Sequence, residues 1–536
     1  MAKGKRKRAF GLLIATRDDP KTAPRKFREF AKKTCNFTPC RLSFPLPAPT
    51  MGTKHALYET MPSWSGLAYQ LHEFWAVVSS HRRHSRKSLQ VFTVRSDIRG
   101  PIWFWLYRFL VLFPLVIGAV FRPPGAGRGF LLSFAVACGY VGLSIVALEF
   151  SLVARLKHVA GAFGQDALEQ FHRQMAYVAT LFLLAHPILL LACGYPLGLL
   201  NPFSSGSTWA WRWGTIGLCF LLVLMVLSMG YKLFRMTYEW WHATHQLLAP
   251  AVLIAALLHI FKVSGFTGTP PMKALWVVYA SGFLGITIYH RIYMPLQIWR
   301  RPWRVVRNVT ELGDSRTLVL QPVDHKGLSF EPGQFAWLSL GKTPFHGEEH
   351  PISFSSSAEN PAGAEVSFTI KALGDWSSTV VPKIQPGTRV WVDGPYGVFS
   401  PDRDQGPGYV LLGGGIGITP LYSMCLTMAD RGDLRPILLF YGAREFQELT
   451  FRFELDQLTR RMNLKCIYVL EHASADWHGE TGLINVNLLR RYLPRQYQRF
   501  QYFICGPLAM MDAMERVLPA MGIAPENIHT ERIGDV

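Results

Sequence analysis

Four histidines inside apolar segments constrain this chain more than any other feature of its sequence. His172 and His186 lie in one apolar segment, His245 and His259 lie in another, and the spacing is 14 residues in both. At about 100° per residue, 14 steps end about 40° short of four full turns, so each pair lies on one helical face. The same 14 residues rise about 21 Å, which fits inside a hydrocarbon core of about 30 Å. Two such helices side by side would present two facing histidine pairs, one near each membrane surface.

An imidazole inside a membrane is costly and rare unless it has a partner. Two stacked six-coordinate b-type haems would provide such partners, because haem iron is held axially by imidazole. The sequence therefore predicts His172, His186, His245 and His259 as iron ligands. The matched spacing favours this interpretation over four histidines that only form hydrogen bonds within a bundle. His242 competes with His245, but the 17 residues from His242 to His259 turn about 260°, which takes His242 off the shared face.

The composition predicts a multi-pass membrane protein. Of 536 residues, 49% are hydrophobic and only 17% are charged. Six apolar stretches approach the length of about 20 residues that a spanning helix needs. They cover residues 101–121, 130–154, 170–192, 211–231, 241–261 and 272–292. We expect an all-α six-helix transmembrane bundle in a plasma membrane or a bacterial inner membrane.

Basic residues orient the bundle. Arg155 and Lys157 follow the second stretch and Lys232 and Arg235 follow the fourth, whereas residues 193–210 contain no charged residue. The positive-inside rule then places both termini in the cytoplasm, with His172 and His245 near the cytoplasmic surface. Arg122, Arg128 and Lys262 fall on the outer side as exceptions.

The first 99 residues form a basic region. They hold 20 Lys and Arg against 6 Asp and Glu, which gives +14 of the net charge of +20. No zinc-finger or helix-turn-helix pattern accompanies this charge, so we expect contact with anionic lipid rather than nucleic acid. The scarcity of any periodic apolar pattern predicts partial disorder.

The chain after residue 300 has a soluble composition. Short alternating runs at 315–322, 335–341, 365–373 and 388–393 predict a small antiparallel β-barrel. From residue 408, apolar strands alternate with helical segments, which predicts an α/β domain with a parallel sheet that binds a nucleotide. The predicted domains are a basic region at 1–99, a haem domain at 100–296, a barrel at 301–403 and a nucleotide-binding domain at 406–536.

Two motifs lie in the predicted parallel sheet and two in the barrel. GGGIGITP at 413–420 follows a strand and opens a helix, where glycines allow a pyrophosphate to approach backbone N–H groups. CGP at 505–507 ends a later strand, where open α/β sheets place their ligands. HPISFSSS from His350 offers hydroxyls on a strand, and KALGDWSS from Lys371 offers a cation, a glycine and hydroxyls for a phosphate.

With the paired histidines, these motifs resemble the ferric reductase and NADPH oxidase superfamily, in which a six-helix haem domain is fused to a ferredoxin-NADP-reductase-type module. The resemblance covers about residues 100–536. It implies that FAD contacts the two barrel motifs, with Ser353 at the isoalloxazine edge, and that the nicotinamide nucleotide contacts the glycine loop and the CGP segment. The implied cofactor-binding residues are His350, Pro351, Ile352, Ser353, Lys371, Trp376, Ser377, Gly413, Gly414, Gly415, Gly417, Thr419, Pro420, Cys505, Gly506 and Pro507. Ser353 and Cys505 are the implied catalytic residues.

The resemblance implies electron transfer from cytoplasmic NAD(P)H through FAD and two b-type haems to an extracytoplasmic acceptor. Arg444 follows the strand ILLFYG and favours NADPH, since a guanidinium holds a 2′-phosphate, whereas Glu445 would suit the free ribose of NADH. The acceptor is expected to be a ferric chelate, with oxygen as the alternative. Leu190 stands where oxidases of this superfamily carry a second histidine, which weakens an oxygen site.

Three further points remain open in the sequence. The tail HTERIGDV places Ile533 or Val536 where many members of the superfamily have an aromatic residue over the flavin. A rival function is a membrane transporter or sensor that responds to NAD(P)H, although such a protein needs no paired iron ligands. The sequence also allows a homo-oligomer.

Overall fold

The computed structural model describes six ranges of the chain, namely 99–121, 129–263, 265–341, 343–345, 349–360 and 365–532. The predicted basic region lies outside the described residues up to position 98, as do Arg122, Arg128, Ile533 and Val536.

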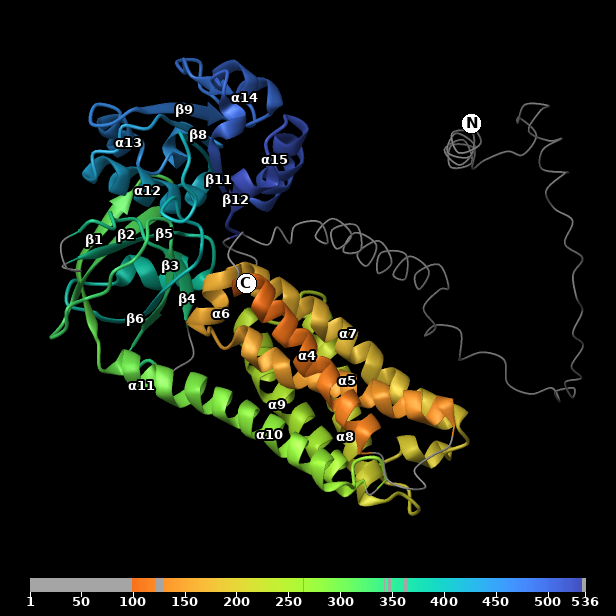
Figure 1. Ribbon diagram of the computed structural model, residues 1–536. Coiled ribbons are helices and arrows are strands. Elements are labelled where there is room, and N and C mark those ends of the chain that lie inside the picture. Colours follow the sequence, from red (N-terminus) through yellow and green to blue (C-terminus); the bar gives the residue numbers. More distant parts are fainter. Residues whose placement is uncertain are drawn as a thin grey trace, which may run out of the picture. The chain divides into compact units, whose positions relative to one another are not determined.

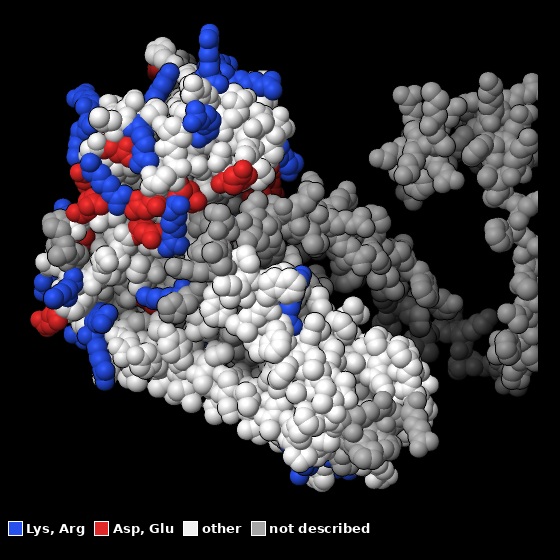
Figure 2. Space-filling view, in the orientation of Figure 1, with Lys and Arg blue, Asp and Glu red and all other residues white. Residues whose placement is uncertain are grey.

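Six apolar helices are long enough to cross a membrane, which confirms the predicted bundle. They are α4 (Arg99–Val120), α5 (Phe130–Val153), α7 (Gln165–Ala192), α8 (Trp209–Gly230), α9 (Tyr238–Lys262) and α10 (Pro270–Ile288), the last extended by a π turn and α11 (Met294–Trp299). Thr208 and Thr237 cap α8 and α9 by accepting hydrogen bonds from Trp211 N and Trp240 N. The face of the bundle seen in Figure 2 is nearly free of charged side chains between its ends, whereas charges cover the β-sheet modules.

The helices of the bundle associate chiefly in two pairs (Figure 1). Helix α5 packs along α7, and α8 packs along α9. A buried apolar cluster that includes Tyr140, Leu253 and Trp276 joins α5, α9 and α10. These contacts fix the two histidine-bearing helices, α7 and α9, within the bundle.

Six antiparallel strands form the predicted barrel: β1 (Trp303–Glu311), β2 (Ser315–Pro322), β3 (Phe335–Leu340), β4 (His350–Ser353), β5 (Val366–Lys371) and β6 (Arg389–Tyr396). They are ordered β4-β3-β6-β1-β2-β5, and a bridge from Phe354 to Phe368 joins the two edge strands. The sheet thus closes on itself around a core that includes Trp303 and Phe368. Strand β1, which the alternating pattern did not single out, lies at the centre of this sheet.

The second sheet is parallel throughout, as predicted. Its strands are β7 (Tyr409–Gly414), β8 (Ile437–Ala443), β9 (Leu464–Leu470), β10 (Glu480–Thr481), β11 (Gln501–Cys505) and β12 (Ile528–Thr530). Their order is β10-β9-β8-β7-β11-β12. Helices α12 (Ile418–Asp430), α13 (Arg452–Leu458), α14 (Val486–Tyr492) and α15 (Leu508–Ala520) surround it. Two buried apolar clusters cover the two faces of the sheet, as expected for buried parallel strands.

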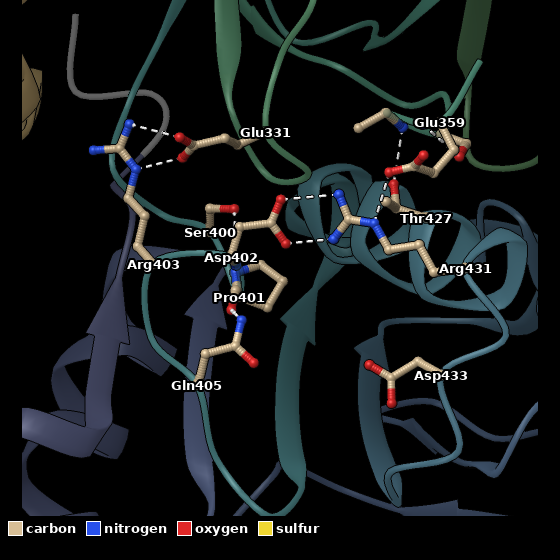
Figure 3. Close-up of polar contacts among 12 residues, drawn as sticks. Glu331, Glu359, Ser400, Pro401, Asp402, Arg403, Gln405, Thr427, Arg431 and Asp433 are labelled. Carbon is tan, nitrogen blue, oxygen red and sulfur yellow. Dashed lines mark hydrogen bonds and ion pairs between the residues drawn. The ribbon is translucent and has the colours of Figure 1, made fainter. Parts of the chain in front are cut away.

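Ion pairs fasten the parallel-sheet domain to the barrel (Figure 3). Arg431 at the end of α12 contacts Asp402 at 2.5 Å and Glu359 at 2.7 Å. Arg403 in the segment between the two domains pairs with Glu331 of the barrel. The hydrogen bonds from Arg431 raise its pKa above the usual value. These contacts join the parallel-sheet domain to the barrel through the end of α12 and the segment between the two domains.

Candidate functional site

The outer histidine pair consists of His186 on α7 and His259 on α9. The two ring centroids lie 6.3 Å apart with an interplanar angle of 72°. Each Nδ1 lies 2.7 Å from a backbone carbonyl oxygen, that of Ala135 for His186 and that of Ala210 for His259. A carbonyl only accepts hydrogen bonds, so each Nδ1 carries the proton and each Nε2 is left as the coordinating nitrogen.

Glycines on the neighbouring helices make room for these two imidazoles. A Cβ atom placed on Gly214 of α8 would lie 2.8 Å from Nδ1 of His259, and one on Gly139 of α5 would lie 3.1 Å from Nδ1 of His186. In both helices the glycine follows the carbonyl-bearing alanine by four residues, one turn later. The same small motif therefore holds both outer histidines.

The inner pair consists of His172 on α7 and His245 on α9. Their ring centroids lie 6.2 Å apart with an interplanar angle of 66°. Nδ1 of His245 lies 3.2 Å from the hydroxyl of Ser228, and Nδ1 of His172 contacts the carboxylate of Glu149. Glu149 belongs to α5 and is only 8% exposed. Nδ1 of each of the four histidines thus has a polar contact within the protein, which leaves Nε2 as the nitrogen available for coordination.

The geometry of both pairs fits axial ligation of iron. Two metal–nitrogen bonds of about 2.0 Å and the radii of two imidazoles separate the ring centroids by roughly 6.2 Å. No group of three or more His, Cys, Asp and Glu side chains that could hold a bare metal ion occurs among the described residues. Two imidazoles suffice for an iron whose equatorial ligands come from a porphyrin. His242 does not face either pair; it contacts the side chain of Gln246 and stacks on Tyr238.

The predicted flavin motif forms β4, at one edge of the barrel sheet. The ring of His350 stacks on that of Trp376 at a centroid distance of 3.8 Å. Pro351 and Ile352 pair across the sheet with Trp337 and Ala336 of β3. Ser353 is 3% exposed, and its hydroxyl oxygen has no hydrogen-bond partner among the residues that the structure describes. A buried hydroxyl without a partner suits a site where a ligand provides the missing hydrogen bond.

The second barrel motif is engaged within the protein. Nζ of Lys371 lies 2.9 Å from Oε2 of Glu448, so the cation is ion-paired with a carboxylate of the parallel-sheet domain. The hydroxyl of Ser377 accepts hydrogen bonds from the backbone N–H groups of Leu373 and Gly374 and closes the loop between β5 and the turn at Trp376. The structure therefore gives Ser377 a loop-closing role that the sequence did not predict.

The glycine loop and the CGP segment meet, because the strands that precede them, β7 and β11, are neighbours in the sheet. Cys505 pairs with Gly413 across β11 and β7. A Cβ atom on Gly417 would lie 2.4 Å from the carbonyl oxygen of Cys505, so only glycine fits there. The other residues of the two motifs lie at the ends of neighbouring elements. Gly413 and Gly414 end β7, and Gly415 and Gly417 begin and end the 3₁₀ turn that follows it. Thr419 and Pro420 lie in the first turn of α12, where the Thr419 hydroxyl donates to Ile416 O, and Gly506 and Pro507 precede α15.

Two residues near this loop are buried acids. Cys505 is 1% exposed, and burial, together with the charge of Glu531, raises the pKa of its thiol well above the usual value. Glu531 follows β12 directly and is 6% exposed, and its Oε2 has no hydrogen-bond partner in the described part of the chain. Burial raises the pKa of Glu531 well above its usual value. Glu531 was missed because a lone acid in the tail HTERIGDV carries no recognisable pattern; only the fold buries it beside Cys505.

Arg155 connects the bundle to the barrel. It lies in the turn after α5, in the left-handed conformation with φ of 49°. Its guanidinium pairs with Glu349 at 2.6 Å and Asp393 at 3.3 Å and lies 3.7 Å from the ring centroid of Trp337, the cross-strand partner of Pro351. Burial acts to lower the pKa of Arg155, but the two carboxylates outweigh it and raise the pKa. The sequence marked Arg155 only as an orienting charge.

Arg444 follows β8 and is exposed at the carboxyl edge of the sheet. Open α/β sheets bind nucleotides along this edge. Its side chain is therefore accessible to a ligand at the place where the sequence predicted the adenosine ribose.

The chain matches two protein families in the two places that the fold distinguishes. Residues 138–256 match the family described as Ferric reductase like transmembrane component, and residues 411–516 match the Oxidoreductase NAD-binding domain. The chain joins a ferric-reductase-like membrane domain to a ferredoxin-NADP-reductase-type module. These matches confirm the predicted superfamily, the multi-pass membrane location and the class of NAD(P)H-dependent oxidoreductase.

Curated relatives of this ferric-reductase-like oxidoreductase include a flavohemoprotein of Bacillus subtilis, 26% identical over 292 residues, which are 52% of this chain and 72% of the relative. The reductase component of propane 2-monooxygenase of Rhodococcus jostii is 30% identical over 237 residues, 43% of this chain and 62% of the relative. The chain thus covers less than two thirds of the Rhodococcus protein. These similarities support FAD and NAD(P)H binding by the reductase module.

Solved structures also resemble parts of the chain. The FAD/NAD-binding domain of nitric oxide dioxygenase from Vibrio cholerae is 23% identical with a TM-score of 0.39, covering 44% of this chain and 98% of that domain. A flavohemoglobin from Malassezia yamatoensis is 18% identical with a TM-score of 0.42, covering 76% of this chain and all of that protein.

Proposed function

We propose that this oxidoreductase passes electrons from cytoplasmic NAD(P)H through FAD and two b-type haems to a ferric chelate on the opposite side of the membrane. The two facing histidine pairs carry this proposal. Each of the four imidazoles has a polar contact at Nδ1, and the ring centroids lie 6.2 Å apart in one pair and 6.3 Å apart in the other. This arrangement suits two irons, each held by two histidines. A transporter or sensor would need neither pair.

The proposed direction of electron flow follows the arrangement of the inner pair. His172 contacts Glu149, which precedes Arg155 by six residues on the chain. Arg155 in turn pairs with Glu349 and Asp393 of the barrel. His172 and His245 are therefore the pair nearer the reductase domains, and His186 and His259 are the pair nearer the far surface. With the basic residues of the positive-inside rule on the reductase side, both termini are cytoplasmic.

The residues of the chain bind and position the cofactors. When bound, FAD supplies conversion between hydride and single-electron transfer, and haem iron supplies one-electron transfer. His350, Ser353 and Trp376 would hold the flavin, while the glycine loop and Arg444 would hold the nucleotide. Each NAD(P)H delivers two electrons, so it reduces two ferric ions to ferrous ions and leaves one proton in the cytoplasm. His186 and His259 would together fill the two ligand positions that a porphyrin leaves on its iron. The acceptor would therefore receive its electron without binding to the haem iron.

Haem content tests the proposal directly. The purified full chain should show the spectrum of two low-spin b-type haems. His245→Ala should remove the inner haem and His259→Ala the outer one, while the matched variant His242→Ala should keep both. A wild-type preparation without haem absorbance, after expression with adequate haem, would show that the proposed function is wrong.

The acceptor requires a separate measurement. In proteoliposomes with saturating NADPH, ferrous-chelate formation without oxygen is compared with superoxide-dismutase-sensitive cytochrome c reduction in air. Ferric reduction should account for most of the NADPH consumed. If superoxide accounts for nearly all of it and ferric chelates add no anaerobic turnover, the ferric proposal is wrong.

Oxygen reduction is the second candidate because a further cation lies near His259. Arg212 lies on the same turn of α8 as Gly214, which contacts His259, and its buried Nε has no hydrogen-bond partner among the described residues. A fixed positive charge stabilises negative charge that develops on reduced oxygen. A loss of superoxide formation in Arg212→Gln, with ferric reduction unchanged, would support this second activity.

The nucleotide preference is tested at Arg444. We propose NADPH as the preferred reductant because this exposed guanidinium can hold a 2′-phosphate. The ratio of kcat/KM for NADPH to that for NADH should fall towards one in Arg444→Ala. Equal values in the wild type would refute the preference.

A further inference from the structure

One of the four histidines differs from the others in what its Nδ1 contacts. His186 and His259 donate to backbone carbonyls, and His245 lies beside a neutral hydroxyl. His172 alone among them contacts a carboxylate, that of Glu149. The two proposed haem sites therefore have different electrostatic surroundings, although their ring geometries are nearly the same.

The carboxylate lies deep inside the protein. Glu149 is 8% exposed, and its helix α5 packs along α7, which carries His172. A charge in such surroundings is poorly screened by solvent, so its effect on a neighbouring group is larger than at a surface. Glu169 lies three residues before His172 on α7, but it accepts a hydrogen bond from Gln165 instead of contacting a histidine.

A carboxylate on the far nitrogen of an imidazole makes the coordinating nitrogen more basic. A more basic ligand stabilises ferric iron more than ferrous iron, because the ferric ion carries one more positive charge. This effect lowers the reduction potential of the iron that His172 would hold, and it does not operate at the outer pair, whose Nδ1 atoms face backbone carbonyls.

We propose that Glu149 is a positioning residue that holds the inner haem at a lower reduction potential than the outer haem. The inference rests on the proposed function, since it requires both haems. An electron that arrives from the reductase side then moves downhill to the outer haem. The direction of transfer across the membrane is thus set by one carboxyl group that contacts one ligand.

The test is a spectroelectrochemical titration of the full chain with both haems bound. In Glu149→Gln, which keeps the shape of the side chain, the inner haem should become at least tenfold easier to reduce, about 59 mV for a one-electron couple. The outer haem should not change. The control is Glu169→Gln, which removes a carboxylate from the same helix as His172 without touching a ligand, and should leave both potentials unchanged.

Two results would overturn the proposal. One is a Glu149→Gln protein that retains both haems with wild-type potentials. The other compares the wild type with His245→Ala. The haem that this variant loses should be the one with the lower reduction potential, and the inference is wrong if the lost haem has the higher reduction potential. This second measurement decides the matter even if Glu149→Gln loses its inner haem. Absence of haem from the wild type would instead refute the proposed function.

Discussion

A single methyl group added to α8 should weaken the outer haem site. In Gly214→Ala the new Cβ would lie 2.8 Å from Nδ1 of His259, well inside the 3.4 Å at which ordinary contact begins. The imidazole would have to move by about 0.6 Å, the difference between these two distances. Its 2.7 Å hydrogen bond to Ala210 O cannot survive such a shift unchanged.

The size of the effect follows from the role of that hydrogen bond. Loss of an outer-shell partner of a metal-bound histidine typically lowers metal affinity by about 10- to 100-fold, or about 1.4–2.8 kcal/mol. Gly139→Ala intrudes less on His186, with a contact of 3.1 Å, so its effect should be smaller. Gly282→Ala in α10 is the matched control, because a Cβ there meets nothing within 4 Å.

The assay is the haem-to-protein ratio by pyridine haemochrome, together with the rate of haem transfer to an excess of apomyoglobin. Gly214→Ala should lose its outer haem fastest, followed by Gly139→Ala, with Gly282→Ala equal to the wild type. If Gly214→Ala releases haem no faster than the wild type, or Gly282→Ala releases it as fast, the role assigned to the glycine is refuted.

Three further outcomes are expected. Arg155→Leu leaves Glu349 and Asp393 without their cation, and breaking a buried ion pair lowers the free energy of unfolding by about 3–5 kcal/mol. Stopped-flow haem reduction by NADPH should slow at least tenfold while flavin-dependent ferricyanide reduction persists; haem reduction at the wild-type rate would contradict the role of Arg155 in joining the bundle to the barrel. Ser353→Ala removes the hydroxyl that would hydrogen-bond the flavin, a bond worth about 0.5–1.5 kcal/mol. Flavin reduction by NADPH should therefore slow by about two- to tenfold, and an unchanged rate would refute the role proposed for Ser353. Burial, reinforced by the charge of Asp166, raises the pKa of Glu531, so the folded chain holds this proton more tightly than the unfolded chain, and stability should fall as pH rises from about 4.5 through the folded pKa. The Tm of Glu531→Gln should not show this fall, and identical pH profiles of Tm for the variant and the wild type would refute the prediction.

The sequence predicted the parts of the fold that depend on local pattern. Six apolar stretches gave six spanning helices, and the spacing of 14 residues placed each histidine pair on one face. Helix ends were less accurate, since α7 begins at Gln165, five residues before the predicted stretch, in a polar turn that no hydropathy pattern includes. Alternation and glycine turns likewise identified the parallel sheet and most of the barrel.

Contacts between distant segments were not predictable. The Nδ1 partners at Ala135 and Ala210 are backbone atoms, which every residue has, so no residue type reveals them. Glu149 looks like a lone acid in an apolar run until α5 and α7 are packed together. Lys371 matched a phosphate-binding pattern, yet its charge is paired with Glu448 of the other domain, a contact that no local sequence pattern reveals.

The pairing of α5 with α7 and of α8 with α9 has a consequence for how the protein is made. Each helix pair supplies one histidine at each level, so neither pair alone contains a complete site. Chains emerge from the ribosome with the N-terminal part first, and α9 is the fifth spanning helix. On the proposed function, neither iron could gain its second ligand until the fifth span has entered the membrane and the two pairs have met. Insertion of the proposed haems would therefore be a late event in biogenesis.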